Sequence, residues 1–469
     1  MQFNSLSYLL LLGLTLLGFF ALRPLARLWL LIGASLLFYA AWSIPFTGLI
    51  VLSAVIDYTA SLGIHGSQRP GRRRAFLLLS LVANLGLLGY FKYANFFLDN
   101  IRAVFGEGVV GQGLSVVLPP GISFYTFQTM SYTIDVYRRE ITPTRSFSRM
   151  FLFVTFFPQL VAGPIERAGH LLTQFEVAIR SRFRVENLVV GSRMIIWGMA
   201  KKVLLADPCA YLVEPVYAAP AQYDGWTLLV ATYAFTLQIY FDFTAYSEIA
   251  RGSARLFGID LMRNFDQPYL VTNISDFWRR WHISLSTWIR DYVYLPLGGN
   301  RGSKPRVLFN LVMTMFLSGL WHGAAWTFVI WGLYHGALLL FDVLLRRTPT
   351  ADRLREQWPR ATAAFGWALT FHLAVLGWVF FRAATMADAG AVVRGIARGV
   401  FTGVPSGLQL WFLASVAVLL VLARLERRHR LLDRIDGDLP LSVVFYGALI
   451  GAMTLFAAGE GPAFIYFQF

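Results

Sequence analysis

Long apolar runs, separated by short clusters of basic residues, make up most of the chain. Several runs approach or exceed the roughly 20 residues that a helix needs to cross a hydrocarbon core of ~30 Å. These runs are Ser5–Leu22, Ala75–Phe91, Thr227–Ile249, Val307–Leu345, Ala363–Phe381 and Leu408–Ala423. The pattern predicts an all-α polytopic membrane protein with roughly ten to twelve transmembrane helices.

Two apolar stretches are too short or too interrupted to form simple spans. Residues 150–163 contain Pro158, and two lysines interrupt residues 190–206. Backbone that departs from a regular helix is tolerated at membrane depth only where protein surrounds it. We therefore expect re-entrant or interfacial segments here. The chain has no internal repeat and no long linker, which predicts a single transmembrane domain over residues 1–469.

The composition supports a membrane environment and changes the interpretation of the net charge. Hydrophobic residues make up 57% of the chain and charged residues 14%, whereas soluble domains carry about 25% charged residues. A formal net charge of +15 would suit a nucleic-acid partner. The basic residues, however, sit in short clusters between apolar runs, as expected for cytoplasmic loops. We expect membrane lipids around the chain and no nucleic-acid partner.

The basic clusters also predict an orientation. No basic residue precedes the first apolar run and no cleavage pattern ends it, so we expect a retained helix rather than a signal peptide. Arg23 and Arg27 follow that run, which predicts an outward-facing N-terminus. Most later clusters agree with this orientation, while Arg382, Arg394 and Arg398 do not.

Several kinds of chemistry are excluded by what the sequence lacks. Cys209 is the only cysteine, so an internal disulfide, a cysteine-based zinc site and a redox pair are excluded. The sequence has no P-loop, no dinucleotide-binding glycine pattern, no nucleophile elbow and no cluster with metal-ligand spacing. We therefore expect no metal site and no tightly bound cofactor.

His322 is the leading candidate for chemistry because of where its apolar run breaks. Val307–Leu345 is long enough for two passes, with a break near Ser318–Gly323. The first arm, residues 307–321, would measure about 22 Å as a helix, less than a core of ~30 Å. We therefore expect His322 to lie below the outer membrane surface.

A line of polar residues leads to His322. Asn310, Thr314, Ser318 and His322 follow one another at intervals of four and share one helix face. Polar groups at membrane depth are costly and mark functional positions. The alternative is a packing histidine that donates to a backbone carbonyl. The polar line and the nearby break favour function for His322, whereas His335 would face away on a continuous helix and is interpreted as structural.

His282 is the second candidate. From Trp278 to Tyr292 apolar residues recur at helical spacing, with most of the charged residues, among them Arg290 and Asp291, elsewhere. This pattern predicts an amphipathic helix at the membrane interface. A surface anchor without catalytic function is the alternative.

Acidic residues in or near apolar runs form a third group. They are Asp57, Asp135, Asp242 and Glu248. Proton pathways use such residues, and buried hydrogen-bond networks use them as well. We favour the second interpretation.

Together these motifs resemble the membrane-bound O-acyltransferase family, and within it the alginate O-acetyltransferase-like branch. Two histidine motifs carry the resemblance, namely residues 278–286 with residues 296–301, and residues 318–323. Supporting motifs lie at residues 89–95, 121–125, 240–243 and 464–469. The resemblance extends over nearly the whole chain.

The resemblance implies that His322 is the catalytic histidine and His282 a second, nearby one. It implies re-entrant and interfacial helices around a central tunnel. The acyl donor would be a cytoplasmic thioester, either acetyl-CoA or an acyl carrier. The acceptor would be an extracytoplasmic, alginate-like polysaccharide, and periplasmic acetylation proteins would be partners. Such a protein would be a multi-pass component of the bacterial inner (cytoplasmic) membrane.

These expectations lead to a hypothesis for the chemistry. His322 would act as general base, since an imidazole with an unperturbed pKa of ~6.5 is matched to proton transfer near pH 7. His282, with Arg290 or Asp291, would orient the donor or stabilise the oxyanion. Further residues expected to bind substrate are Asn310, Ser318, Trp321 and Trp281.

Three alternatives remain open at this point. The acyl group could pass through a covalent intermediate on Ser318 or on a partner protein. The reaction could be D-alanyl transfer to teichoic acid or another envelope polymer. A transporter or flippase would also use polar residues at membrane depth, although the matched internal repeats common in transporters are not found.

Overall fold

The computed structural model confirms an all-α fold. It describes residues 1–106, 108–109, 111, 113–345, 348–456, 462 and 464–465, and within these ranges the regular elements are helices, with no strand. Arg346 and Arg347, which end one predicted run, and residues 466–469 of the C-terminal motif lie outside the described residues.

Seven helical segments among the described residues are long and apolar enough to cross a membrane. They are Ile44–Gly66, Pro70–Phe105, Gly225–Leu256, Trp326–Leu345, Pro359–Arg382, Gly407–His429 and Leu439–Phe456. Two shorter apolar helices are α1 (Leu6–Ala21) and α2 (Pro24–Ala40). The predicted ten to twelve spans exceed these seven, because other helices, such as α14, are rich in polar residues.

The described chain divides into two compact units, and the prediction of one domain over residues 1–469 stays a prediction. The first unit comprises residues 1–199 and 246–263. Besides α1 and α2 it holds α3 (Ile44–Gly66), α4 (Pro70–Leu88), η1 (Gly89–Tyr93), α5 (Ala94–Phe105), α6 (Ile122–Arg138), α7 (Phe147–Thr155), α8 (Ala168–Arg180) and α9 (Val185–Ala200).

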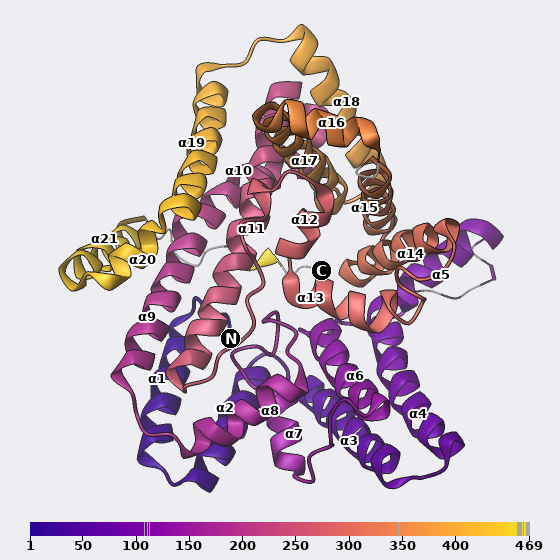
Figure 1. Cartoon of the computed structure of the whole chain (residues 1–469), viewed down its shortest axis with the longest axis vertical. Coiled ribbons are helices and arrows are strands. Elements are labelled where there is room, and N and C mark those ends of the chain that lie inside the picture. The colour runs from indigo at the N-terminus through magenta and orange to yellow at the C-terminus, as the bar shows by residue number, and fades with distance from the viewer. Residues whose placement is uncertain are drawn as a thin grey trace. The chain divides into compact units, whose positions relative to one another are not determined.

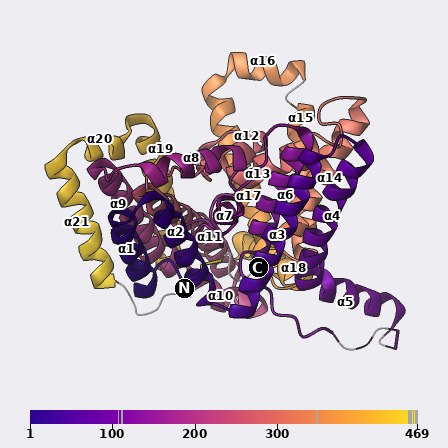
Figure 2. The same cartoon turned by 90° about the horizontal axis from the view of Figure 1, so that it is seen from below.

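In this first unit α3, α4 and α6 lie side by side (Figures 1 and 2). Buried Asp57 on α3 accepts hydrogen bonds from Ser80 at 2.5 Å and from Asn84 at 2.9 Å, both on α4. Asp57 is thus part of a buried hydrogen-bond network. The predicted non-spanning segment at residues 150–163 contains the end of α7, whose nine residues are too few to span.

The second unit comprises residues 200–245 and 264–465. Its elements are η2 (Lys201–Ala206), α10 (Asp207–Ala218), η3 (Pro220–Gln222), most of α11 (Gly225–Leu256), η4 (Pro268–Leu270), α12 (Ile274–Arg280), α13 (Ile283–Ile289), η5 (Arg290–Tyr294), α14 (Lys304–His322), α15 (Trp326–Leu345), α16 (Pro349–Gln357), α17 (Pro359–Arg382), α18 (Met386–Thr402), α19 (Gly407–His429), α20 (Leu431–Gly437) and α21 (Leu439–Phe456).

The apolar stretch at residues 190–206, which two lysines interrupt, is helical throughout. α9 reaches Ala200, the π-helical η2 follows over Lys201–Ala206, and α10 continues from Asp207. A π-helical turn widens a helix without ending it. The chain therefore stays helical past both lysines, and Lys202 is buried with 1% of its surface exposed.

The helical hairpin of α14 and α15 confirms the predicted break. α14 ends at His322, and α15 begins at Trp326. α14 starts at Lys304, so its 19 residues measure about 28 Å. It is therefore longer than the predicted first arm, and its length alone does not place His322 below the membrane surface.

Small residues bring α14 and α15 close together. A Cβ built on Gly332 of α15 would lie 2.4 Å from the carbonyl oxygen of Met315 on α14. A Cβ built on Gly319 of α14 would lie 2.3 Å from the carbonyl oxygen of Phe328. Small residues allow membrane helices to approach with their backbones in contact. This contact fixes the end of α14, and with it His322, against α15.

Candidate active site

His322 is the last residue of α14 and is buried, with 4% of its surface exposed. Aromatic rings surround its imidazole. The ring centroid lies 5.0 Å from that of Trp321, 5.1 Å from that of Trp331 on α15 and 5.1 Å from that of Phe381 on α17. All three contacts are edge-on. Aromatic rings from α14, α15 and α17 thus bury the imidazole.

His282 lies at a sharp turn between α12 and α13. Its backbone is left-handed, with φ 42° and ψ 57°, a conformation that is uncommon for a residue with a side chain. Asn264 holds this turn, because its carbonyl oxygen accepts from the Ile283 N–H at 2.9 Å and its Oδ1 accepts from the Ser284 N–H at 3.3 Å. The amphipathic helix predicted over Trp278–Tyr292 is therefore two short helices and a π-helical turn.

The turn brings His282 to His322. Their ring centroids are 6.4 Å apart, and His282 is completely buried. Trp321 lies beside both imidazoles, 6.0 Å from His282 by ring centroids. Phe243 of α11 packs edge-on against the His282 ring at 4.6 Å. The structure thus brings together the two histidines that the sequence analysis singled out.

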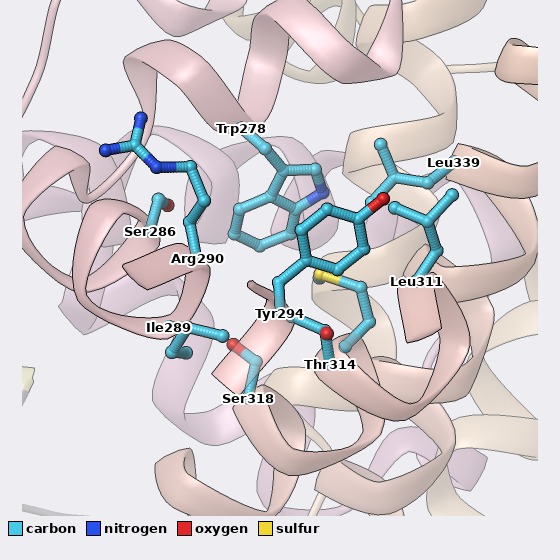
Figure 3. Close-up of a pocket in the computed structure, with 10 residues that line it drawn as sticks. Trp278, Ser286, Ile289, Arg290, Tyr294, Leu311, Thr314, Ser318 and Leu339 are labelled. Atoms are coloured by element: carbon cyan, nitrogen blue, oxygen red, sulfur yellow. The ribbon is translucent and has the colours of Figure 1, made fainter. Parts of the chain in front are cut away.

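A cavity of about 170 Å³ lies along the polar face of α14 (Figure 3). It is lined by Trp278, Ser286, Ile289, Arg290, Tyr294, Leu311, Thr314, Met315, Ser318 and Leu339. Ser318 precedes His322 by one helical turn on the same face. The volume is that of a few water molecules, at about 30 Å³ each, and would accept a short acyl group.

The predicted substrate-binding residues divide between this cavity and its surroundings. Ser318 and Arg290 line the cavity, and the Arg290 guanidinium extends away from the Tyr294 ring (Figure 3). The Asp291 carboxylate pairs with the Arg290 Nε at 2.8 Å but is not part of the lining. Asn310 is buried at the far end of the polar line, where its Nδ2 donates to the Gly299 carbonyl at 3.1 Å.

Trp281, another predicted substrate-binding residue, lies next to the histidine pair. Its ring is buried in an aromatic cluster, 4.7 Å from Trp378 and 5.0 Å from Phe265 by centroids, and it is not part of the cavity lining. Its neighbour His282 faces the other histidine because the backbone reverses between α12 and α13. In the structure Trp281 therefore packs in the aromatic cluster next to the histidine pair.

Several aromatic residues at the site were not predicted. Trp331, Phe381 and Phe243 enclose the histidines, and Tyr294 lines the cavity. Phe243 could have been noticed, because it belongs to one of the supporting motifs. Trp331 and Phe381 lie in apolar spans where aromatic residues are common, so no pattern distinguishes them. Among the described residues, no three His, Cys, Asp or Glu side chains are grouped to hold a metal.

An all-helical chain with several apolar spans defines a polytopic membrane protein, and its buried histidine pair is a candidate reactive site. Residues 112–385 match the membrane-bound O-acyltransferase family. The chain belongs to this family and is a multi-pass membrane O-acyltransferase. Membership confirms the resemblance found in the sequence and sets the transporter alternative aside.

Curated relatives share most of the chain's length. A probable alginate O-acetylase of Azotobacter vinelandii is 40% identical over 389 residues, which cover 82% of this chain and 75% of the relative. A peptidoglycan O-acetyltransferase of Helicobacter pylori is 36% identical over 81% of this chain and 76% of its own length. A teichoic acid D-alanyltransferase of Bacillus subtilis is 27% identical over 56% of this chain and 68% of its own length.

Replacing His282 with glutamine is expected to slow acyl transfer without shifting the acidic limb of its pH profile. Burial lowers the pKa of the His282 imidazole to about 3. The ring is therefore neutral above that pH and gains a proton only below it, outside the usual range of an assay. The measurement is kcat/KM against pH for both proteins. A limb displaced by about one pH unit in the variant would mean that His282 titrates near neutrality.

Proposed function

We propose that the chain is a membrane-embedded O-acetyltransferase that acylates hydroxyl groups of an extracytoplasmic, alginate-like polysaccharide. The observation that carries this proposal is the buried pair of His282 and His322, with ring centroids 6.4 Å apart. Ser318, one helical turn before His322, lines a small cavity whose lining includes neither histidine. The higher identity to the O-acetylases than to the D-alanyltransferase supports acetyl as the group transferred.

In the proposed reaction His322 is the general base. An imidazole nitrogen of His322 takes the proton of an acceptor hydroxyl as its oxygen attacks the carbonyl carbon of an acyl thioester. A C–O bond forms, the C–S bond breaks, and the departing thiolate receives the proton from His322. Exclusion of water by the rings of Trp321, Trp331 and Phe381 favours transfer to the polymer over hydrolysis.

The residues around His322 have complementary roles in this proposal. His282 is neutral and orients a substrate by hydrogen bonding rather than by charge. The cavity receives the acyl group, with the Ser318 hydroxyl at its wall, one turn from His322. Arg290 lines the cavity, and its exposed guanidinium, which is paired with Asp291 at 2.8 Å, would contact an anionic part of the donor outside the cavity.

The wider setting follows the same proposal. In this proposal the donor is a cytoplasmic thioester, either acetyl-CoA or an acyl carrier. The protein itself lies in the bacterial inner membrane. Periplasmic acetylation proteins would be its partners on the acceptor side. Peptidoglycan is the second candidate acceptor, and the similarity to the Helicobacter pylori enzyme over 81% of the chain favours it.

Deletion of the coding gene separates these acceptors. We expect mass spectrometry of the mutant's envelope to show loss of acetyl esters from secreted polysaccharide, while peptidoglycan keeps its esters. Wild-type protein supplied in trans should restore the esters, and the His322→Ala variant should not. Loss confined to peptidoglycan would identify the second acceptor, and an unchanged ester content in both polymers would contradict the proposed function.

A further inference from the structure

Two of the supporting sequence motifs meet at a buried lysine in the second unit. Asp242 belongs to the motif at residues 240–243 on α11, and Phe464 and Ile465 begin the C-terminal motif. The Asp242 carboxylate pairs with the Lys202 ammonium through Oδ1 at 2.7 Å and accepts from the Ile465 N–H through Oδ2 at 2.5 Å. In Figure 1 the short yellow piece of chain beside α11 is this C-terminal segment.

The Lys202 side chain joins three parts of the chain. Its Nζ lies 2.8 Å from Asp207 Oδ1 at the start of α10 and donates to the Pro462 carbonyl at 2.8 Å. The same Nζ lies 4.5 Å from the centre of the Phe464 ring, a cation–π contact. Two of the three ammonium donors thus go to Asp242 and Pro462, and the contact with Asp207 is an ion pair. The π-helical turn at η2 directs this lysine inward.

The ion pair of Lys202 and Asp242 is buried, so its charges must be satisfied by other protein groups. Lys202 and Asp242 are 1% and 2% exposed. A buried ion pair is tolerated only when hydrogen bonds satisfy its remaining donors and acceptors. Main-chain groups of Pro462 and Ile465 supply two of those bonds. The C-terminal segment is therefore attached to α11 and η2 by contacts whose loss would leave buried charges unsatisfied.

The next residue of α11 connects this cluster to the active site. Phe243 follows Asp242 directly, and its ring packs edge-on against His282 at 4.6 Å. It also packs edge-on against Phe265 at 5.1 Å. Any rotation or shift of α11 at Asp242 would thus move the aromatic surface that supports His282. The distance between the two histidine rings depends on that support.

We propose that Lys202 and Asp242, completed by the C-terminal segment, are positioning residues that hold Phe243 and thereby His282 in the arrangement for acyl transfer. This inference rests on the proposed function. Neither residue touches the reacting groups. Their effect is on the geometry of the histidine pair, so it falls on the rate of the chemical step more than on substrate binding.

The test uses the purified full-length chain in proteoliposomes, with radiolabelled acetyl-CoA as donor and alginate oligosaccharides as acceptor. Asp242→Asn keeps the shape but removes the charge that pairs with Lys202. We expect kcat to fall about tenfold to a hundredfold, as for small misplacements of catalytic groups, with KM changed by less than about threefold. Lys202→Met should behave alike, and Lys202→Arg should recover a large part of the rate.

Tyr217→Phe is the matched control. It removes a buried hydrogen bond of 3.0 Å to Thr232, also between α10 and α11, but leaves Asp242 untouched, and should retain the wild-type kcat. If Asp242→Asn fails to fold, Ile465→Pro decides, because it removes the N–H that donates to Asp242 Oδ2, together with the Ile465 side chain, and leaves Lys202 and Asp242 in place. Wild-type kcat in the folded Asp242→Asn variant, or in Ile465→Pro, would overturn the inference. Absence of transfer by the wild-type chain would instead count against the proposed function.

Discussion

Replacing His322 with alanine is expected to abolish measurable acyl transfer while the protein still inserts and folds. A positioned general base contributes about 10²–10⁴-fold to a rate, and the ring of the neighbouring His282 lies 6.4 Å away by centroids. His322→Gln tests the same point with less loss of volume, because glutamine keeps hydrogen-bonding capacity but cannot act as a base. The measurement is ester formation on polymer per mole of purified protein.

His372→Ala is the control for this experiment. His372 is also a membrane-helix histidine, but it lies on the exposed side of α17, where its Nδ1 is 2.7 Å from the Ala368 carbonyl oxygen. Its replacement should leave the rate unchanged. Polymer acylation at the wild-type level by His322→Ala would eliminate His322 as the base. The alternative mechanism, in which Ser318 carries the acyl group as a covalent intermediate, would then be tested. Wild-type protein would be incubated with labelled donor alone, and labelled protein would be trapped.

The fold class could be predicted because lipid imposes a simple requirement on composition. Runs of about 20 apolar residues have few explanations other than a membrane span. The helices Trp326–Leu345 and Gly407–His429 fall on predicted runs for this reason. α14 also falls on a predicted run, as the first arm of Val307–Leu345, although it buries the polar residues Asn310, Thr314 and Ser318. Apolar periodicity does not show whether a helix faces lipid or protein, so the number of spans was the less certain part.

The histidine pair could be anticipated from motifs but not from spacing. His282 and His322 are 40 residues apart in the sequence, and their contact depends on the left-handed backbone at His282. A non-glycine residue adopts that conformation when its surroundings impose it, and here Asn264 supplies two of the hydrogen bonds that do so. Helical periodicity therefore predicted one continuous helix, where the structure has two short helices and a π-helical turn.

The buried lysine shows the same limit. Lys202 in an apolar segment suggested an interruption, because an unpaired charge at membrane depth is costly. Its partners, Asp207, Asp242 and Pro462, come from both neighbouring and distant parts of the sequence. Only the folded chain brings them together. Pairing with these residues thus allows a lysine that interrupts an apolar run to be buried in the second unit.

Replacing Gly332 with alanine is expected to cause the largest loss of stability among single-methyl additions to α15, together with loss of activity. The added Cβ would lie 2.4 Å from the Met315 carbonyl oxygen and 3.2 Å from the Gly319 Cα. Backbone atoms of α14 cannot rotate away as a side chain would. The two helices must separate, and overpacking of this kind costs about 1–3 kcal/mol.

Separation of the hairpin should also reach the chemistry, because the end of α14 carries His322 and α15 carries Trp331, whose ring is 5.1 Å away. A displacement near 1 Å can reduce a rate by about a hundredfold. Gly447→Ala on α21 is the control, since its Cβ would meet nothing within 4 Å, and alanine is favoured there by about 0.5–1 kcal/mol. Thermal unfolding in detergent and acyl transfer are measured for both variants. A Gly332→Ala protein as stable and as active as the wild type would mean that the glycine contact does not set the position of His322.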